Sequence, residues 1–451
     1  MQVTYLVDRD FIPDDGSEKV IARFVKGVDD KSEAVLYPDV HYKKGARTVN
    51  GLLIASKDRI FPAMLGVANC GFTFGRLDGV CIEQKELLSQ AFETYSRNAV
   101  AKPIPIDRMR AKLAEYISLA YRDQQDQTFS FCGVDSHTRI EEMIDAVFPG
   151  NSLRVAAGAL GTLGGGNHFF ELHRVDSIYS KLNGLRTNDI IFILHTDSGA
   201  AGDIVNLTLS NLSELGYLKG IVGAARRFRM RLSQARYFML STKLFYHNFL
   251  DSLKLLFSKN DLRYIPAHSI LGKHILLAFA IAAAIGEMNR DQILKDFMEC
   301  ARTILPSIRV QVFESHSHDS LSVEKHGNEK MVVHRNGVQR IGKSSCFVLP
   351  GALGTESYLF KNTGNAEAYL SANHGTGRLL DKHLARSAFK AGDTEAQLKN
   401  NNVALFRRGR GNLAEQHPGA FKNVLAVAEM MEKYDLGKIS ARLLPMMAMK
   451  G

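Results

Sequence analysis

The pattern of hydrophobic and polar residues predicts a chain that mixes strands with helices. The N-terminal third contains three runs typical of short strands separated by glycine turns: AVLYPDVH at 34–41, GLLIAS at 51–56 and the start of GVCIEQKELL at 79–88. The last of these runs leads into a predicted helix that ends near residue 99. DIIFILH at 189–195 is a run of apolar residues followed by small and polar ones. Such a run favours a buried strand.

Helical spacing dominates the middle of the chain. Apolar residues recur at this spacing from about 205 to 303, and the longest apolar run, at 275–286, is too short to span a bilayer and is typical of a buried core helix. Strand-like runs return at 309–315, 330–335, 345–351 and 357–360, and a last helix at 421–436 precedes a C-terminal strand. Strands on both sides of the helical stretch predict one α+β domain over 1–451, with a helical insert at about 205–303.

Composition narrows the class of protein. With 45% apolar and 23% charged residues among 451, the chain has the composition of a soluble globular protein, and its first residues do not resemble a signal peptide. Five widely spaced cysteines form neither a disulfide framework nor a CxxC zinc motif, which favours a reducing, cytoplasmic location. The net charge of +10 favours a polyanionic partner, nucleic acid first and an anionic membrane second, although many basic proteins bind neither.

Residues with metal-binding or phosphate-binding chemistry concentrate in six short phrases. These are PDVH at 38–41, NCG at 69–71, GGGNH at 164–168, HTDSG at 195–199, ESHSHD at 314–319 and NHGTGR at 373–378. One cysteine and several histidines suit a borderline-soft divalent ion such as zinc, manganese or iron, and the glycines would let backbone amides approach a phosphate. These residue types on separate strand ends and loops could therefore form a transition-metal site.

Each phrase also has an ordinary structural interpretation. Cys70 between Asn and Gly is most often a buried, inert thiol in a turn, and His195 at the end of an apolar strand is more often a hydrogen-bonded core histidine. The glycines of both Gly-rich phrases are typical of loops. His316 and His318 lie two residues apart, and a surface pair is the commoner interpretation. The spacing between the phrases does not by itself assemble them into one site.

Taken in order, the phrases resemble the RtcB family of RNA ligases, from about residue 35 to the last residue. The resemblance rests on PDVH at 38–41, GNHF at 166–169 followed by Glu171, FILHTDSG at 192–199, AAAIGEMNR at 282–290, PGALGTESY at 350–358, NHGTGR at 373–378 and the final Lys450-Gly451. It implies an α+β fold with central β-sheets around a metal cleft. It also implies an enzyme that uses GTP and Mn²⁺ to join an RNA 2′,3′-cyclic phosphate or 3′-phosphate to a 5′-hydroxyl, in RNA repair or tRNA splicing.

The resemblance assigns roles to individual residues. His374 matches the histidine that receives GMP, and Asp39 matches a supporting acidic residue near it. The expected metal ligands, for one or two ions, are Cys70, His168, His195 and His318. The expected nucleotide-binding residues are Asn167, Glu171, Arg378, Phe421 and Lys450, with Phe421 in place of a tyrosine that packs on the guanine.

The sequence departs from the family at several of these phrases. Val67 stands where the family has an aspartate metal ligand, so we expect the second ion to be weaker, held by another group such as Asp39, or absent. Asp319, Asn336, Asn373 and Ala352 replace an asparagine, a lysine, a cysteine and a serine. Two alternatives therefore stay open beside the ligase: a guanylyltransferase that caps 3′-phosphate ends without sealing, and a non-catalytic RNA-binding paralogue. A metallohydrolase acting on phosphoesters would use the same cluster without His374.

Two basic runs lie outside the phrases. ARRFRMR at 225–231 is in the predicted insert, and RRGR lies at 407–410. Their functional interpretation is contact with the RNA backbone. For the run at 225–231 this interpretation is slightly favoured, because the positive net charge of the chain also suits RNA. Their structural interpretation is a solvated helix face and a surface loop.

Overall fold

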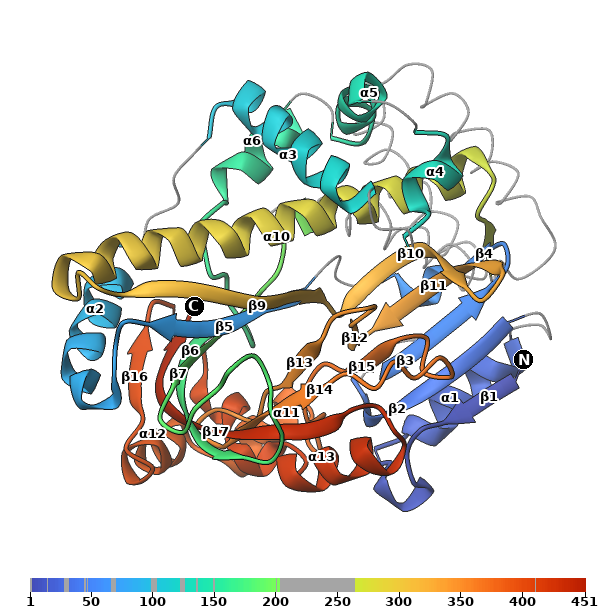
Figure 1. Cartoon of the computed structure of the whole chain (residues 1–451). Coiled ribbons are helices and arrows are strands. Elements are labelled where there is room, and N and C mark those ends of the chain that lie inside the picture. Colours follow the sequence, from blue (N-terminus) through green and yellow to red (C-terminus); the bar gives the residue numbers. More distant parts are fainter. Residues whose placement is uncertain are drawn as a thin grey trace.

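Two β-sheets lie at the centre of the protein (Figure 1). The structure is a computed structural model that describes residues 2–13, 15–27, 32–43, 46, 48–65, 70–98, 104–121, 126–134, 137–148, 151–199, 201–202, 264–409 and 411–451. One sheet has the strand order β1-β2-β3-β11-β10. The larger, eight-stranded sheet has the order β13-β14-β17-β6-β7-β5-β9, with β16 paired to β17. Two-stranded sheets join β12 to β15 and β4 to β8.

The strands are mostly antiparallel to their neighbours, and the exceptions are β1 with β2 and β16 with β17. Their bounds are β1 Gln2–Tyr5, β2 Ser32–Tyr42, β3 Val49–Ser56, β4 Arg59–Ile60, β5 Gly71–Asp78, β6 Phe169–Ile178, β7 Ile190–Thr196, β8 Ile265–Pro266, β9 Arg309–Ser317, β10 Asp319–His326, β11 Glu329–Asn336, β12 Val338–Arg340, β13 Cys346–Leu349, β14 Ser357–Lys361, β15 Ser371–Asn373, β16 Ala404–Arg407 and β17 Lys438–Lys450.

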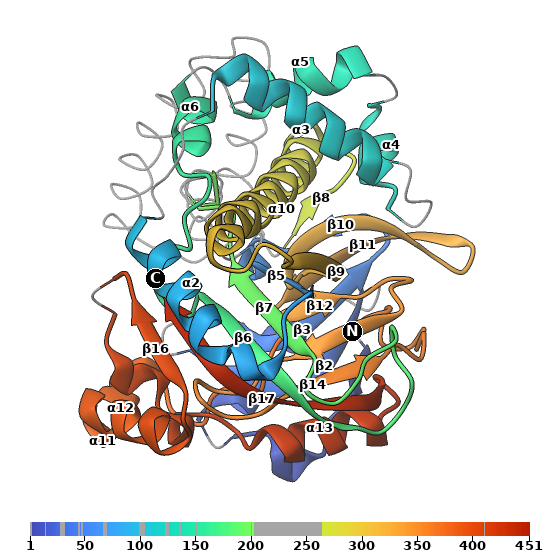
Figure 2. The same ribbon diagram turned by 60° about the vertical axis from the view of Figure 1, so that its left-hand side comes forward.

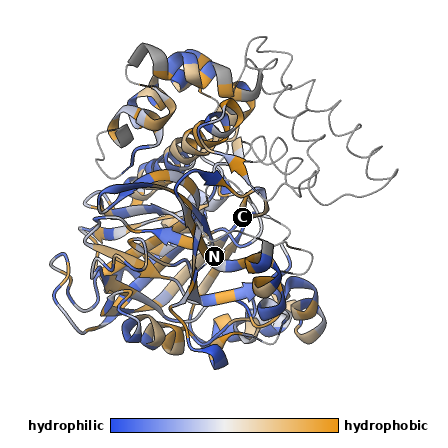
Figure 3. Cartoon of the chain, turned by 90° about the vertical axis from the view of Figure 1, so that its right-hand side faces the viewer, coloured by the Kyte–Doolittle hydropathy of each residue, from blue (hydrophilic) through white to orange (hydrophobic). Residues whose placement is uncertain are grey.

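Helices cover the sheets from several sides. Their bounds are α1 Ser17–Gly27, α2 Lys85–Asn98, α3 Ile106–Tyr121, α4 Thr128–Cys132, α5 His137–Val147, α6 Asn151–Gly158, α10 Ile270–Ile304, α11 Lys382–Ala388, α12 Ala391–Asn400 and α13 Val424–Lys433. Helix α10 runs between the sheets and the layer formed by α3 to α6, as Figures 1 and 2 show from two directions. Figure 3 shows hydrophobic and hydrophilic residues mixed along the helices of this layer, as amphipathic helices require.

Helix α10 is the longest of the described elements, and its sequence explains both its start and its burial. The Ser269 hydroxyl caps the helix by accepting a hydrogen bond from the amide of Gly272 at 3.0 Å. By length and composition this helix could cross a membrane, but 67% of its most apolar window is buried inside the protein. Ile275, Ile281 and their neighbours pack into a core shared with α3 and α5. The apolar run at 275–286 is therefore a core helix in this structure, as its length predicted.

Helices and sheets are mixed in the structure, which agrees with the α+β prediction. The strands expected at 34–41, 51–56, 189–195, 309–315, 330–335, 345–351 and 357–360 are confirmed. The helix preceding residue 99, the helix near 421–436 and the C-terminal strand are confirmed too. The strand expected at the start of 79–88 is wrong, because Ile82–Gln84 form a 3-10 helix that leads into α2. Helices α3 to α6 were not anticipated. Within the predicted insert, 270–303 is helical and Ile265–Pro266 is a strand, whereas 203–263, including the basic run at 225–231, lies outside the described residues.

Candidate metal and nucleotide site

One edge of the eight-stranded sheet carries the candidate metal ligands. Strand β5 begins at Gly71, directly after Cys70, and Gly71 is paired with Thr196 of β7 and Ser317 of β9. Because these strands are antiparallel, the start of β5 meets the ends of β7 and β9. Cys70, His195 and His318 therefore come together although more than a hundred residues separate each from the next along the chain.

Strands β6 and β17 extend the same edge. Phe169, the first residue of β6, is paired with His195 of β7 on one side and with Lys450 of β17 on the other. His168 directly precedes Phe169. The strand pairing thus places His168 beside the Cys70 cluster and brings Lys450, near the end of the sequence, to the same edge.

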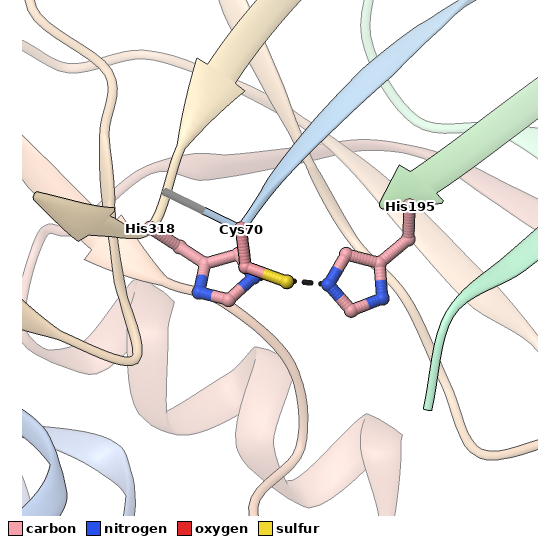
Figure 4. A group of neighbouring side chains, drawn as sticks. All are labelled: Cys70, His195 and His318. Carbon is pink, nitrogen blue, oxygen red and sulfur yellow. Dashed lines mark hydrogen bonds between the residues drawn. The ribbon is translucent and has the colours of Figure 1, made fainter. Parts of the chain in front are cut away.

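The side chains of Cys70, His195 and His318 point toward one another (Figure 4). One ligand atom of each lies within 4.8 Å of the other two, and all three residues are buried. His195 Nε2 is 3.0 Å from His318 Nε2, and the amide of His318 donates to the carbonyl of Cys70 at 2.9 Å. His168 joins them from β6, with Nε2 3.1 Å from Cys70 Sγ.

Burial determines the protonation of this cluster. It lowers the pKa of His168, of His195 and of His318, so each imidazole is neutral near pH 7 and keeps a lone pair. Burial raises the pKa of the Cys70 thiol well above its usual range, so a thiolate here needs a compensating cation. One sulfur and three neutral imidazoles fit a first-row divalent ion, which would displace the thiol proton on binding.

His374 lies next to this cluster and is paired with Asp39. Its ring centre is 4.9 Å from that of His318. His374 Nδ1 is 2.6 Å from Asp39 Oδ2, and the His374 backbone amide donates to the same oxygen at 3.2 Å. Burial by itself would lower the pKa of His374, but the hydrogen bond and the charge of Asp39 outweigh burial and raise that pKa. With Nδ1–H donating to the carboxylate, Nε2 carries the free lone pair.

Asp39 is fully buried and tightly enclosed. Gly51 has a φ of +73°, and a Cβ there would lie 2.7 Å from Asp39 Oδ1, so only glycine fits opposite the carboxylate. The ammonium of Lys422 donates to the carbonyls of Pro38 and Val40 at 2.7 and 3.0 Å, on either side of Asp39. The backbone around Asp39 is therefore held at both neighbours, which fixes the carboxylate against His374.

All the candidate residues except Asp39 line one cavity of about 700 Å³. They are Cys70, Asn167, His168, Glu171, His195, His318, His374, Arg378, Phe421 and Lys450. The structure thus brings together the residues that the chain distributes between positions 70 and 450, and it places Asp39 directly behind His374.

Lys450 and Glu171 lie on the neighbouring strands β17 and β6. Lys450 is buried, with Nζ 5.6 Å from the centre of the Phe169 ring. Burial lowers the pKa of Lys450 to about 8, and the charge of Glu171 opposes that shift. His173 Nε2, 3.1 Å from Glu171 Oε2, holds the carboxylate from the next inward-facing position of β6. A lysine withdrawn from water in this way would gain from a bound anion.

Arg378 and Phe421 form a second group in the cavity. The guanidinium carbon of Arg378 lies 4.3 Å above the centre of the Phe421 ring, and Arg378 Nη1 donates to the carbonyl of Glu415 at 2.9 Å. One face of Phe421 is therefore covered by arginine. An aromatic base would have to stack on the other face of the ring.

The residues that differ from the family pattern have different surroundings in the structure. Val67 lies outside the described residues. Asn336 Nδ2 donates to the carbonyl of Val49 at 2.9 Å, so it ties β11 to β3. Asp319 places Oδ2 3.3 Å from His318 Nδ1. Asp39, proposed from the sequence as a substitute metal ligand, instead bonds to His374.

Three further residues of the site were given no role from the sequence. Lys43 and Asp197 line the cavity. Arg290 of α10 is buried, donates to Thr73 Oγ1 at 3.0 Å, and carries a positive charge that lowers the pKa of the Cys70 thiol against the effect of burial. The signal for Arg290 was an arginine directly after a long apolar run, in the interior of a helix, where a buried charge must have a partner. Asp197 stood in the same phrase as His195 but had no assigned partner.

Comparison with known proteins gives the family. A family model described as "tRNA-splicing ligase RtcB" matches residues 25–451. The chain belongs to the RtcB family. A tRNA-splicing ligase RtcB of Methanococcus maripaludis is 23% identical over 453 residues, which cover 92% of this chain and 87% of that protein. An RNA-splicing ligase RtcB of Mycobacterium bovis is 26% identical over 323 residues, covering 66% of each chain. A tRNA-splicing ligase RtcB of Pyrococcus abyssi is 26% identical over 324 residues, covering 65% of this chain and 32% of that protein.

Membership in the RtcB family agrees with the resemblance inferred from the six phrases. The matched region begins before Asp39 and ends at the last residue, so it includes the whole cavity. At 23–26% identity, the role of each residue has to be judged from its geometry in this structure, above all where the residue differs from the family pattern.

Proposed function

We propose that this protein is a GTP- and Mn²⁺-dependent RNA ligase that joins an RNA 2′,3′-cyclic phosphate or 3′-phosphate end to a 5′-hydroxyl through a histidine–GMP intermediate. One observation carries the proposal: a histidine held by a buried carboxylate lies beside a cysteine–histidine cluster in one cavity. A metallohydrolase would need the cluster but would not require the His374–Asp39 pair. The names of the relatives, which are tRNA-splicing or RNA-splicing ligases, support RNA as the substrate.

His374 would act as the nucleophile toward GTP. Its Nε2 lone pair would attack the α-phosphorus, forming a P–N bond while the bond to the leaving pyrophosphate breaks. Asp39 would keep the proton on Nδ1 and stabilise the positive charge that develops on the ring. An oxygen of the RNA 3′-phosphate would then take the GMP and release His374. The 5′-hydroxyl of the second RNA end would attack the 3′-phosphate and expel GMP.

Cys70, His168, His195 and His318 would hold one or two divalent ions beside His374. Such ions neutralise phosphate oxygens and stabilise the charge that develops during phosphoryl transfer. The four residues would contribute by positioning, because strand ends fix their side chains and burial excludes water from the reacting groups.

Several other cavity residues would bind the nucleotide and the RNA. Lys450, Asn167 and Glu171 would contact GMP, and Phe421 would stack on the guanine with the face that Arg378 leaves uncovered. Lys43, Lys382 and His383 also line the cavity and would face the RNA phosphates. We infer that the chain acts as one catalytic domain, because the cavity draws residues from both sheets, and that it works in the cytoplasm.

The test is incubation of the purified protein with α-labelled GTP and Mn²⁺, followed by a denaturing gel. We expect an acid-labile label on the wild type and none on His374→Ala. Two RNA pieces, one ending in a 2′,3′-cyclic phosphate and one starting with a 5′-hydroxyl, then test sealing. Labelling without joined RNA would favour the capping guanylyltransferase. An unlabelled wild type with several divalent ions would favour the non-catalytic RNA-binding protein.

A further inference from the structure

His173 is a buried imidazole that the proposed chemistry does not use. It lies on β6, two residues after Glu171, so the two side chains are on the same face of the strand. His173 is fully buried, and Val175 and Ile191, its neighbours on that face, belong to an apolar cluster. Its ring nitrogen Nδ1 has no hydrogen-bond partner among the described residues. An apolar side chain of similar size would avoid that unpaired nitrogen.

The contact with Glu171 gives this imidazole a role. His173 Nε2 lies 3.1 Å from Glu171 Oε2. An ionised carboxylate only accepts hydrogen bonds, so the ring proton is on Nε2 and Nδ1 keeps a lone pair. Glu171 lines the cavity and His173 does not, so the imidazole contacts the carboxylate from the side away from the cavity. His173 therefore acts on the cavity through Glu171.

Glu171 and Lys450 place a hydrogen-bond acceptor beside a donor on the cavity wall. They lie on paired strands, where Glu171 is opposite Ala448 and Lys450 is opposite Phe169. Burial lowers the pKa of Lys450 and the charge of Glu171 raises it, so the two groups are close enough to interact. The wall thus offers a nucleotide base one carboxylate that accepts and one ammonium that donates.

This pair of groups matches the edge of guanine and not that of adenine. Guanine presents two adjacent N–H donors, at N1 and the 2-amino group, next to the acceptor O6. Adenine presents the acceptor N1 beside its 6-amino donor, so N1 would face the carboxylate and the amino group would face the ammonium. Buried polar groups that the wrong ligand leaves unpaired give such a site its selectivity. A protonated or rotated Glu171 would lose this selectivity, because it could donate to adenine N1.

We propose that His173 is a positioning residue that makes the nucleotide site selective for guanine over adenine by holding Glu171 as an oriented acceptor. A donor on Oε2 stabilises the ionised carboxylate and fixes its plane, so that Oε1 is the oxygen that faces the N–H groups of guanine. The placement of the base beside Glu171 and Lys450 rests on the proposed function, and the role of His173 is additional to it.

The test measures nucleotide binding without transfer. Full-length protein with Mn²⁺ is titrated in a calorimeter with the α,β-methylene analogues of GTP and ATP, whose P–C–P bridge prevents transfer to His374. We expect the wild type to bind the guanosine analogue at least about 100-fold more tightly. His173→Leu should bind it about 10-fold more weakly, because a hydrogen bond to a charged group contributes roughly 10–150-fold. The adenosine analogue should bind no more weakly than before, so selectivity falls.

Three variants separate positioning from a purely structural role. His173→Gln, whose side-chain amide can donate to Glu171, should recover most of the selectivity. Glu171→Gln should lose at least as much selectivity as His173→Leu. The double variant should lose no more than Glu171→Gln alone, because His173 acts through that carboxylate.

The matched control is His334→Leu. His334 of β11 is also buried, and its Nε2 accepts from the amide of Phe61 at 3.1 Å, away from the cavity. This variant should lower stability and leave the selectivity unchanged. Thermal melting checks the fold of each variant, and His173→Met, with a flexible apolar side chain, replaces His173→Leu if that variant does not fold.

Three results would overturn the proposal. The first is a folded His173→Leu or His173→Met with the selectivity of the wild type. The second is a loss that adds in full to that of Glu171→Gln in the double variant. The third is a wild type that binds neither analogue or binds both equally. Because transfer to His374 is not measured, selective binding of the guanosine analogue without labelling by GTP would refute the proposed ligase and leave the role of His173 standing.

Discussion

Replacing Asp39 with asparagine should slow the labelling of His374 far more than it lowers stability. The carboxylate accepts two hydrogen bonds from His374, from Nδ1 at 2.6 Å and from the backbone amide at 3.2 Å. A hydrogen bond to a charged group contributes about 1.5–3 kcal/mol, or roughly 10–150-fold in rate. An asparagine amide can also donate to Nδ1, which would move the proton to Nε2, and in a Ser-His-Asp triad the same substitution costs about 10⁴-fold. We therefore expect labelling to be about 10²–10⁴-fold slower.

The assay is the rate of labelling by α-labelled GTP under single-turnover conditions, measured against pH. Protonated Nε2 cannot attack, and Asp39 raises the pKa of His374, so wild-type labelling should fall as pH drops through that raised value. Without the charge of Asp39, the pKa of His374 falls, so the residual labelling of Asp39→Asn should persist to lower pH. Asp381→Asn, which removes another carboxylate lining the cavity, should label nearly as fast as the wild type. A rate for Asp39→Asn within about threefold of the wild type, with the same pH profile, would refute a role for Asp39 in controlling the proton of His374.

Three further predictions concern stability and nucleotide binding. Glu324→Gln should lower the free energy of unfolding by about 3–5 kcal/mol in urea denaturation, because it leaves the buried guanidinium of Arg335, 2.6 Å from Glu324 Oε1, without its charge partner. Burial alone would raise the pKa of Glu324, but Arg335 and Arg340 hold that pKa well below 4.5. The wild type should therefore lose this stabilisation as pH falls below about 4.5. Equal stability of variant and wild type would argue against the ion pair. Gly51→Ala should lower the free energy of unfolding by about 2–4 kcal/mol in thermal or urea melts, because φ is positive at this position and the new Cβ would lie 2.7 Å from Asp39 Oδ1. An unchanged melt would show that the strand can shift to accept the methyl group. Lys450→Met should weaken GTP binding by about 10-fold or more in calorimetry while retaining the metal, and unaltered GTP affinity would remove Lys450 from the nucleotide site.

Local sequence determined those parts of the protein whose signal is contained within a few residues. The apolar run at 189–195 favoured a buried strand because it is short and is followed by small and polar residues, and β7 is fully buried. The run at 275–286 favoured a core helix because it lies within a long stretch of apolar residues at helical spacing. The order of the six phrases indicated the family that the comparison then confirmed. By contrast, α3 to α6 were missed. Helices α4 to α6 are only 5–11 residues long and give little helical periodicity, and all four helices are buried through a core that they share with α10.

Only the tertiary structure decided how the site is assembled. Cys70, His195 and His318 are brought together by the register of β5 with β7 and β9, and register depends on pairing between segments that no local pattern connects. The same holds for Asp39, which the sequence suggested as a metal ligand and which packing instead places behind His374. Asp197 shows the point most clearly. No local pattern distinguished Asp197 from other aspartates, and it lies beside His168 because Asn289 of a distant helix holds its loop there.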